Sequence, residues 1–228
     1  MSNHRRNETQ LVCDVLGLET LVDEITSKLL QQASPDAMAA TSSAILGPFY
    51  RHNAPILPNG SNIASPKTYE SFFEQSTHFS GRILDSGGRP VVGAIVDVWH
   101  SAPNGMYEQQ DPDQPDYNLR GRFKTDRKGA YEMYCLRPGP YPIPDDGPSG
   151  TLLKMLDRHP WRPAHIHIII QAAGFRTLTT QLFDGDDKFL NNDSVFAVKK
   201  DLVAEFHVRE GDPKAKWSLK YDFVLLEA

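Results

Sequence analysis

The chain has 228 residues, of which 39% are hydrophobic and 23% charged, with a formal net charge of −5. These values are typical of an ordinary globular protein, and the scattered basic residues exclude the positive patch of a nucleic-acid-binding protein. No segment approaches the roughly 20 apolar residues that a membrane span requires. The N-terminus is charged and has no apolar stretch behind it, so we expect no signal peptide.

The chain has two cysteines, Cys13 and Cys135, which lie far apart and outside any metal-binding spacing. A disulfide framework is not expected from such a pair. We therefore expect a cytoplasmic protein in which any metal ion is bound by residues other than cysteine.

Residues 11–32 show the period of an amphipathic helix. Their apolar residues follow spacings of four and three and share one face: Leu11, Val15, Leu18, Val22, Ile25 and Leu29. Such a face packs either on the body of the protein or on a partner subunit, and the pattern fits both. Gly17 weakens a helix by roughly 1 kcal/mol relative to alanine, so a break is expected there.

Residues 33–62 are predicted to form an irregular segment with a hydrophobic group at Ile45–Tyr50. Apolar residues in a loop must be covered, so these either line a ligand pocket or plug one end of the following domain. We divide the chain into an N-terminal helical and linker segment, residues 1–62, and a β domain, residues 63–228.

From about residue 78 the pattern changes to short strands separated by turn signals. Gly87-Gly88 and Arg127–Gly129 are candidate hairpin turns, and Ala173-Gly174 separates two further strands. Seven or eight such strands favour a mainly β fold, a Greek-key β-sandwich with long loops and an N-terminal helical segment. Two short helices are expected near residues 151–159 and 194–203.

Residues 162–170 have the pattern of a buried strand that carries two histidines. Because strand side chains alternate, His165 and His167 project from the same face, about 6–7 Å apart between Cα atoms. This spacing lets both imidazoles bind one metal ion. Two hydrogen-bonded core histidines would show the same pattern, so the pair alone does not distinguish a metal site from ordinary core packing.

Two loops, residues 102–121 and 137–150, are too long for simple hairpins, and each presents a tyrosine beside glycine or proline: Tyr107 and Tyr141. Long loops in a compact domain are often functional, although packed tyrosines with solvated hydroxyls also fit. Two tyrosinates at neutral pH require a strongly Lewis-acidic cation, and ferric iron fits best. A ferrous site would need a carboxylate, for which the local candidate, Asp157, lies outside the strand.

Several segments together resemble the intradiol ring-cleaving dioxygenases, in particular their catechol, chlorocatechol and hydroxyquinol 1,2-dioxygenase branch. The matching segments are ILGPFY (45–50), GRILDSGGRPVVGAIVDVWHS (81–101), YNLRGRFKTDRKGAY (117–131), RPGPYPIPDDGPSGTLL (137–153), RHPWRPAHIHI (158–168) and LTTQLF (178–183). The resemblance covers roughly residues 11–206 and includes Gly105 and Tyr107.

The resemblance implies a metal site and a set of catalytic residues. A non-haem Fe(III) would be bound by Tyr107, Tyr141, His165 and His167, with Tyr141 as the axial ligand that substrate displaces. Arg162 and Gln181 would lie beside the bound substrate. Arg162, always charged, would stabilise negative charge during the reaction; its alternative role is a surface salt bridge.

The resemblance also implies a pocket for an aromatic diol that O2 cleaves to a cis,cis-muconate or maleylacetate-type product. The pocket residues would be Leu11, Asp14, Ile45, Gly47, Pro48, Phe49, Tyr50, Ile143 and Pro144. A carboxylate at Asp14 could accept a hydrogen bond from the additional hydroxyl of hydroxyquinol, so we expect this substrate ahead of catechol or chlorocatechol. The alternative for Asp14 is an exposed charge on a helix.

The resemblance further implies a homodimer formed through the N-terminal helices, with a lipid at the interface, although this helical region is shorter than is usual in the family. Two other protein classes stay open. GRILDSGGRPVVGAIVDVW alone resembles prealbumin-like domains, which would make the chain a non-enzymatic binding module. A zinc or Fe(II) hydrolase could use the same histidines.

Overall fold

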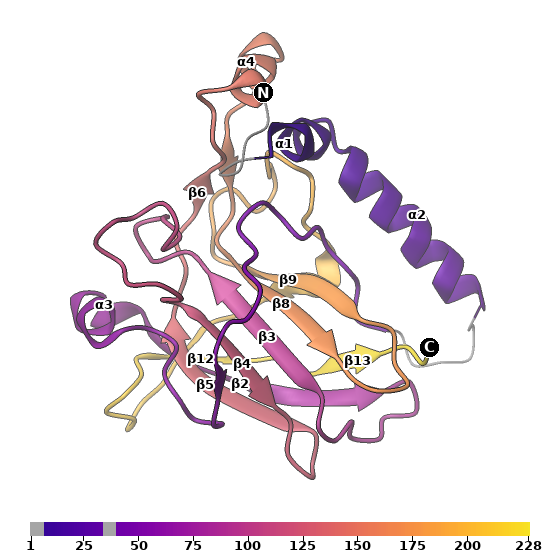
Figure 1. Cartoon of the computed structure of the whole chain (residues 1–228), viewed down its shortest axis with the longest axis vertical. Helices are drawn as coiled ribbons and strands as arrows, with labels where there is room; N and C mark the ends of the chain where they lie inside the picture. The colour runs from indigo at the N-terminus through magenta and orange to yellow at the C-terminus, as the bar shows by residue number, and fades with distance from the viewer. Residues whose placement is uncertain (1–6, 34–39) are drawn as a thin grey trace.

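The computed structural model describes residues 7–33 and 40–228 and shows two β-sheets packed face to face (Figure 1). This is the β-sandwich that the spacing of strands and turns predicts. Residues 1–6 and 34–39 lie outside the described residues, and the second of these ranges belongs to the predicted irregular segment.

The first sheet has six strands and carries the histidine pair. In spatial order they are β1 (Ile56–Leu57), β4 (Arg120–Lys124), β3 (Ile95–His100), β8 (His165–Gln171), β9 (Leu178–Asp184) and β10 (Val203–Ala204). The four central strands pair antiparallel, and the two edge strands pair parallel. The β8–β9 pair confirms that Ala173-Gly174 separates two adjacent strands.

The second sheet is centred on β2 (Ser76–Asp85). The strand β5 (Ala130–Leu136) pairs antiparallel with one side of β2, whereas β12 (Trp217–Lys220) and β13 (Phe223–Leu225) pair parallel with the other. β11 (His207–Val208) extends the sheet beyond β12. A separate two-stranded ribbon consists of β6 (Tyr141–Pro142) and β7 (Trp161–Arg162).

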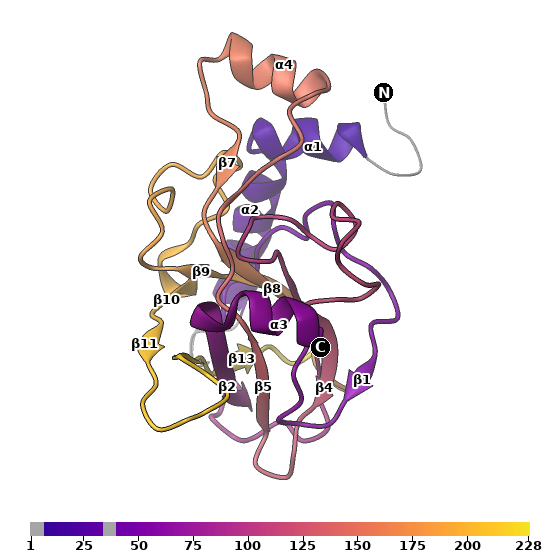
Figure 2. The same cartoon turned by 90° about the vertical axis from the view of Figure 1, so that its left-hand side faces the viewer.

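The helices lie outside the sandwich. α1 (Glu8–Val15) contacts α4 (Pro148–Met155) at one end of the molecule, and α2 (Leu18–Ala33) runs along one side (Figures 1 and 2). α3 (Pro66–Ser71) continues into the short 3-10 helix η1 (Phe73–Gln75). No helix within residues 7–33 and 40–228 is long and apolar enough to cross a membrane.

The two candidate hairpins are wrong, because each turn connects strands of different sheets. The turn at Gly87-Gly88 leads from β2 in the second sheet to β3 in the first, and the turn at Arg127–Gly129 leads from β4 back to β5. The pairing across the first turn is one isolated bridge between Leu84 and Pro90. Turn signals identify where the chain reverses, whereas the partner of each strand depends on distant segments.

The helix expected at residues 194–203 is also wrong apart from one 3-10 turn, η2 (Lys200–Leu202). The carboxylate of Asp193 accepts hydrogen bonds from the backbone N–H groups of Val195 and Ala197, and Phe196 has a positive φ of 61°. An aspartate that binds nearby backbone donors offers the chain an alternative to the helix. The helix expected near 151–159 is present as α4.

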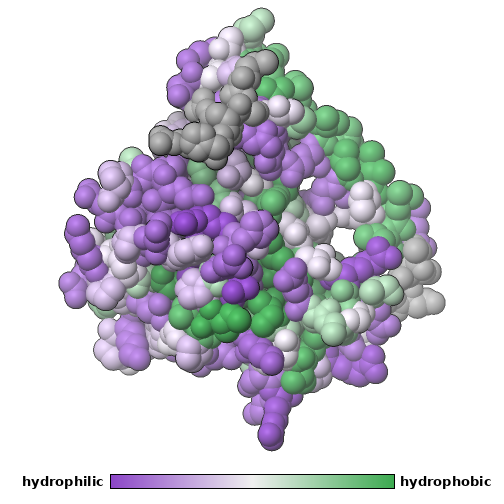
Figure 3. Space-filling model, in the orientation of Figure 1, coloured by the Kyte–Doolittle hydropathy of each residue, from purple (hydrophilic) through white to green (hydrophobic). Residues whose placement is uncertain are grey.

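The predicted N-terminal helix breaks at Gly17, which has a φ of +72°. Leu11 and Val15 on α1 are fully buried, whereas Leu18, Ile25 and Leu29 on α2 are 49%, 50% and 61% exposed. The apolar stripe is therefore divided, and its second half forms the hydrophobic surface seen along α2 in Figure 3.

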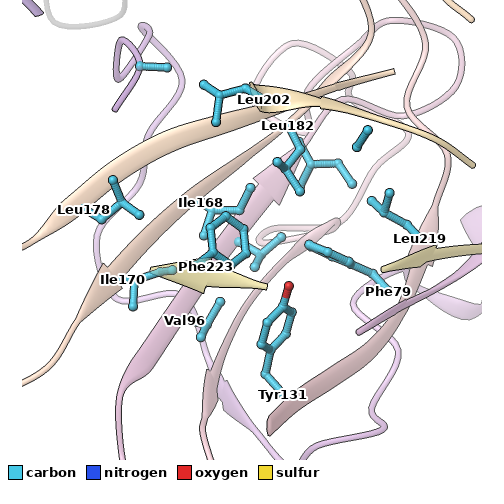
Figure 4. Packing of buried hydrophobic residues seen from close by; sticks show 14 of the residues in the cluster. Phe79, Val96, Tyr131, Ile168, Ile170, Leu178, Leu182, Leu202, Leu219 and Phe223 are labelled. Carbon is cyan, nitrogen blue, oxygen red and sulfur yellow. The ribbon is translucent and has the colours of Figure 1, made fainter. Parts of the chain in front are cut away.

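The main core lies between the two sheets and fixes which way each strand faces (Figure 4). Ile166, Ile168 and Ile170 of β8 pack there, against second-sheet residues such as Phe79 and Phe223. Because side chains alternate along a strand, the histidines of β8 face the opposite side of the sheet. The same alternation separates the core of this protein from its candidate site.

At Gly81 in β2 the backbone of the second sheet packs too closely to leave room for a side chain. A Cβ atom there would lie 1.7 Å from the carbonyl oxygen of Tyr221, which also accepts a 2.8 Å hydrogen bond from Tyr131. Backbone atoms cannot move aside cheaply, so we expect Gly81→Ala to lower the free energy of unfolding by about 3 kcal/mol. Gly87→Ala, in an exposed turn, should cost less than about 1 kcal/mol. Urea denaturation measures both, and equal effects would contradict this account.

Candidate metal centre

Two imidazoles of β8 converge in a buried position. The Nε2 atoms of His165 and His167 lie 3.1 Å apart, and both residues are at most 2% exposed. The Nδ1 atom of His165 lies 2.7 Å from the carbonyl oxygen of Pro163, so Nδ1–H donates and Nε2 keeps its lone pair. Two nitrogen ligands at about 2.1 Å from one ion and at a right angle would be about 3.0 Å apart.

The two tyrosine loops meet each other at a glycine. Gly105 has a φ of +82°, and a Cβ atom there would lie 2.8 Å from the carbonyl oxygen of Pro140. Glycine therefore permits the loop that carries Tyr107 to lie directly against the loop that carries Tyr141. The β6–β7 ribbon then pairs Tyr141 with Arg162, three residues before the first histidine.

These contacts bring the four predicted ligand side chains into one cluster. Ring centroids of Tyr107 and Tyr141 are 5.4 Å apart, those of Tyr141 and His165 are 5.4 Å apart, and those of Tyr107 and His167 are 6.3 Å apart. Three segments that are distant in the sequence supply them: the 102–121 loop, the 137–150 loop and β8.

The phenol oxygens of Tyr107 and Tyr141 are buried and have no hydrogen-bond partner among the described residues. A buried hydroxyl without a partner is costly, so the oxygens are placed for a group that the chain itself does not supply. Burial raises the pKa of Tyr141 and, more strongly, that of Tyr107, and it lowers the pKa of both histidines. Without a cation all four groups are therefore uncharged at neutral pH.

The donor set fits a hard trivalent cation such as Fe(III). Two phenolates and two neutral imidazoles combine anionic oxygen ligands with nitrogen ligands, and a strong Lewis acid would offset the pKa increase of the buried phenols. Within the described part of the chain, no three His, Cys, Asp or Glu side chains form a possible metal site. The carboxylate that a ferrous site would need is therefore not found there.

Arg162 forms a buried ion pair and not the surface salt bridge that was its alternative role. Its Nε and Nη2 atoms each donate to the carboxylate of Asp193 at 3.1 Å, and Nη2 also donates to Gln181 at 2.9 Å. The third nitrogen, Nη1, lies 3.2 Å from Nε2 of His165. Burial lowers the pKa of Arg162, but the charges of Asp193 and Tyr141, together with the hydrogen bonds to Asp193, outweigh burial and raise the pKa above its ordinary value.

Gln181 connects three parts of the site. It accepts from Arg162, its Nε2 donates to the carbonyl oxygen of Ile45 at 2.7 Å, and the same nitrogen lies 3.3 Å from Nδ1 of His167. β8 and β9 place Gln181 directly opposite His167 in register. The side chain thus links the histidine, the arginine and the 45–50 segment.

The nine predicted pocket residues differ in how directly the structure relates them to the cluster. Ile143, Phe49 and Tyr50 pack in the same hydrophobic cluster as the two tyrosines, with Phe49 stacked on Tyr107 at 4.5 Å between centroids. Gly47 lies against His167, since a Cβ atom there would be 3.2 Å from its ring. The side chain of Ile45 packs in the main core. The others are buried or half-buried: Leu11, Asp14, Pro48 and Pro144.

Trp99 and Asp193 are the site residues that sequence reasoning did not single out. The ring of Trp99 stacks on His167 with centroids 4.7 Å apart and planes 4° apart. This contact follows from the pairing of β3 with β8, which places Trp99 opposite His167. Alternation within β3 could have indicated the face on which Trp99 lies, but the register could not be read from the sequence.

Asp14 is buried on α1 and is not the exposed helix charge that was its alternative role. It is 2% exposed, and its Oδ1 atom has no hydrogen-bond partner in the described part of the chain. Burial, followed by the neighbouring carboxyl of Glu19, raises the pKa of Asp14 to about 8. The charge of Arg162 lowers the pKa of Asp14 and that of Asp193 raises it, but both effects are smaller than that of burial.

Comparison with known proteins agrees with the family resemblance of the sequence. A family model described as dioxygenase matches residues 45–227, and one described as catechol dioxygenase N terminus matches residues 1–34. An intradiol ring-cleavage dioxygenase of Aspergillus niger is 43% identical over 96% of this chain and 68% of that protein. A catechol 1,2-dioxygenase of Candida albicans is 45% identical over 99% of this chain and 73% of that protein.

A solved structure agrees with these sequences. The crystal structure of hydroxyquinol 1,2-dioxygenase from Pseudomonas putida matches with a TM-score of 0.88 and 40% identity, covering 100% of this chain and 78% of that one. The chain belongs to the intradiol ring-cleaving dioxygenases. This dioxygenase is therefore an oxidoreductase that cleaves a catechol-type ring, and a non-enzymatic prealbumin-like module is not favoured.

The pKa of Asp14 makes the stability of the dioxygenase depend on pH. Between the ordinary value of 3.8 and about 8, the folded protein holds this proton and the unfolded chain has released it. The free energy of unfolding therefore falls as pH rises through this range, by at most about 1.4 kcal/mol per pH unit. Asp14→Asn removes this contribution, so the variant should gain stability relative to the parent between about pH 5 and pH 8. Urea denaturation at both pH values tests this, and a difference that does not change with pH would contradict it.

Proposed function

We propose that this dioxygenase binds non-haem Fe(III) through Tyr107, Tyr141, His165 and His167 and cleaves hydroxyquinol, with catechol and chlorocatechol as poorer substrates. The observation that carries this proposal is the buried cluster of two imidazoles and two phenol oxygens without partners. When bound, ferric iron would supply the Lewis acidity that prepares an aromatic diol for attack by O2.

Tyr141 is proposed as the base that accepts a proton from the diol. Burial raises the pKa of its phenol, so a phenolate at this position would take up a proton readily. Arg162 pairs with Tyr141 across the β6–β7 ribbon, and because its charge lowers the pKa of Tyr141 it is proposed to stabilise the phenolate until that transfer. Tyr107, whose ring is stacked on Phe49, is proposed to stay in place.

Arg162 is proposed to stabilise negative charge that develops on the substrate. The guanidinium is buried beside the histidines, and its Nη1 atom points toward the cluster. A fixed charge in a site without bulk water stabilises developing charge at little reorganisation cost. Gln181 is proposed to hold both Arg162 and the 45–50 segment in position during turnover.

The preference for hydroxyquinol rests on Asp14. The pocket we propose is lined by Leu11, Asp14, Ile45, Gly47, Pro48, Phe49, Tyr50, Ile143 and Pro144, most of which are apolar. Within it the Oδ1 atom of Asp14 is an acceptor without a partner among the described residues. The third hydroxyl of hydroxyquinol would satisfy this atom, whereas catechol offers no such donor.

The exposed apolar face of α2 supports a homodimer formed through this helix, with a lipid at the interface. Burying side chains such as Val22, Ile25 and Leu29 would stabilise the association by the hydrophobic effect. Cys13 and Cys135 are both free thiols, which supports a cytoplasmic location.

The iron proposal predicts a coloured protein, because ferric tyrosinate absorbs visible light and zinc or Fe(II) at this site would not. Tyr141→Phe should weaken and shift this absorption and lower kcat by about 100-fold or more, since both a ligand and a base are lost. Tyr131→Phe is the matched control, because Tyr131 is also buried but lies in the core between the sheets. A colourless iron-loaded protein, or unchanged spectra and kinetics for Tyr141→Phe, would contradict the proposal.

The substrate proposal predicts that Asp14→Ala lowers the preference for hydroxyquinol over catechol. Loss of one hydrogen bond should reduce the ratio of the two kcat/KM values about 10-fold. Asp14→Asn keeps an acceptor oxygen at this position and should retain more of the preference. Steady-state kinetics with both diols measure the ratio, and an unchanged ratio for Asp14→Ala would remove Asp14 from substrate selection.

A further inference from the structure

Asp193 lies in the turn of residues 193–197, outside both sheets, and its buried carboxylate accepts four hydrogen bonds. The Oδ1 atom accepts from Nε of Arg162 at 3.1 Å and from the backbone N–H of Val195 at 3.3 Å. The Oδ2 atom accepts from Nη2 of Arg162 at 3.1 Å and from the backbone N–H of Ala197 at 3.0 Å. Each oxygen thus faces one guanidinium donor and one backbone donor.

This arrangement requires a carboxylate and not merely a polar side chain of the same shape. Asparagine has one oxygen acceptor and one NH2 donor. Whichever way its amide is turned, the NH2 group faces two donors and loses both hydrogen bonds. A buried donor that loses its partner costs more than the hydrogen bond itself contributed.

The four hydrogen bonds fix the direction in which Arg162 points. Asp193 holds Nε and Nη2, and Gln181 also binds Nη2. The remaining nitrogen, Nη1, is therefore aimed at the cluster, 3.2 Å from Nε2 of His165. Arginine has many rotamers, and without this anchor the guanidinium would be both free to turn and buried without a counter-charge.

The turn that carries Asp193 is itself tied to the elements around it. The backbone N–H of Ser194 donates to the carbonyl oxygen of Trp161, the residue before Arg162. The hydroxyl of Thr20 on α2 donates to the carbonyl oxygen of Val195 at 2.9 Å. The carboxylate is thus placed by β7 on one side and by α2 on the other.

We infer that Asp193 is a positioning residue that holds the guanidinium of Arg162 in the orientation needed for ring cleavage. This inference rests on the proposed role of Arg162 in stabilising charge on the substrate. Asp193 itself reaches Arg162 and the turn, so it acts through the arginine.

The iron-loaded Asp193→Asn variant should show a kcat per bound iron that is about 10- to 100-fold lower than that of the parent enzyme. KM for hydroxyquinol should change less than about 5-fold, because Arg162 stabilises negative charge that develops during the reaction and is not yet present on the bound substrate. The visible spectrum without substrate should stay close to that of the parent, since the ligands are unchanged. A purely structural role would instead lower iron content and alter the spectrum, with little change in kcat per iron.

Asp85→Asn is the matched control. Asp85 is also buried and accepts from two backbone N–H groups, those of Gly87 and Arg89, and from the guanidinium of Arg89. It is the last residue of β2, before the turn that leads to β3, whereas Trp99 lies near the far end of β3. We expect kcat per bound iron to stay within about twofold of the parent value. An equal loss in both variants would overturn the inference.

A double-mutant cycle with Arg162→Met tests whether Asp193 acts through Arg162. If it does, the Asp193→Asn/Arg162→Met enzyme should be no slower than Arg162→Met alone, because the two losses share one cause. Losses that multiply would overturn the inference. If Asp193→Asn does not fold, a folded double variant supports the pairing, since both charges are then removed together. Two unfolded variants would assign Asp193 to folding alone and overturn it.

The activity of the parent enzyme distinguishes a failure of the proposed function from a failure of the role assigned to Asp193. If the iron-loaded parent cleaves none of hydroxyquinol, catechol and 4-chlorocatechol, the proposed function fails. If the parent is active while Asp193→Asn turns over at the parent rate, the proposed function stands and the role of Asp193 is wrong.

Discussion

Strand β8 buries both of its faces, and the two faces meet different surroundings. Ile166, Ile168 and Ile170 pack in the core between the sheets, whereas His165 and His167 face the tyrosine loops. Because the core holds the isoleucines, the histidines cannot turn or slip without breaking the sandwich. The positions of the two histidines in the candidate metal centre are therefore set by the same packing that stabilises the fold.

The loops add to β8 what a strand alone cannot supply. Tyr107 comes from a loop and Tyr141 from the short strand β6, and the hydroxyl of each is buried without a partner among the described residues. Such groups lower the stability of the protein without the metal. A bound cation would remove this cost, so metal binding and the order of the loops are linked.

The sequence was informative where one segment determines its own geometry. Alternation along residues 165–171 was enough to place both histidines on one face, and Gly17 was enough to locate the break between α1 and α2. Two long loops with glycine or proline beside a tyrosine drew attention to Tyr107 and Tyr141, and resemblance to the family implied their role as iron ligands. What failed was the pairing of distant segments: two turns were assigned to hairpins although each connects different sheets. A local pattern carries no information about which strand lies alongside.

The same limit explains what was missed in the site. The partner of Arg162, Asp193, lies 31 residues further along the chain, directly before the segment whose pattern predicted a helix. There the carboxylate of Asp193 competes with helix formation by binding two nearby backbone donors. The carboxylate of Asp193 thus both competes with the predicted helix and binds Arg162. Trp99 was missed because its contact with His167 depends on strand register.

The contact between Gly105 and Pro140 has a consequence for transferring loops between related enzymes. The backbones of the two tyrosine loops touch at this point, so the separation of the phenols depends on both loops at once. A loop taken from a relative with a larger residue at position 105 would push against the carbonyl oxygen of Pro140 and displace its neighbour. Grafting experiments that aim to change substrate range should therefore exchange the two loops as one cassette.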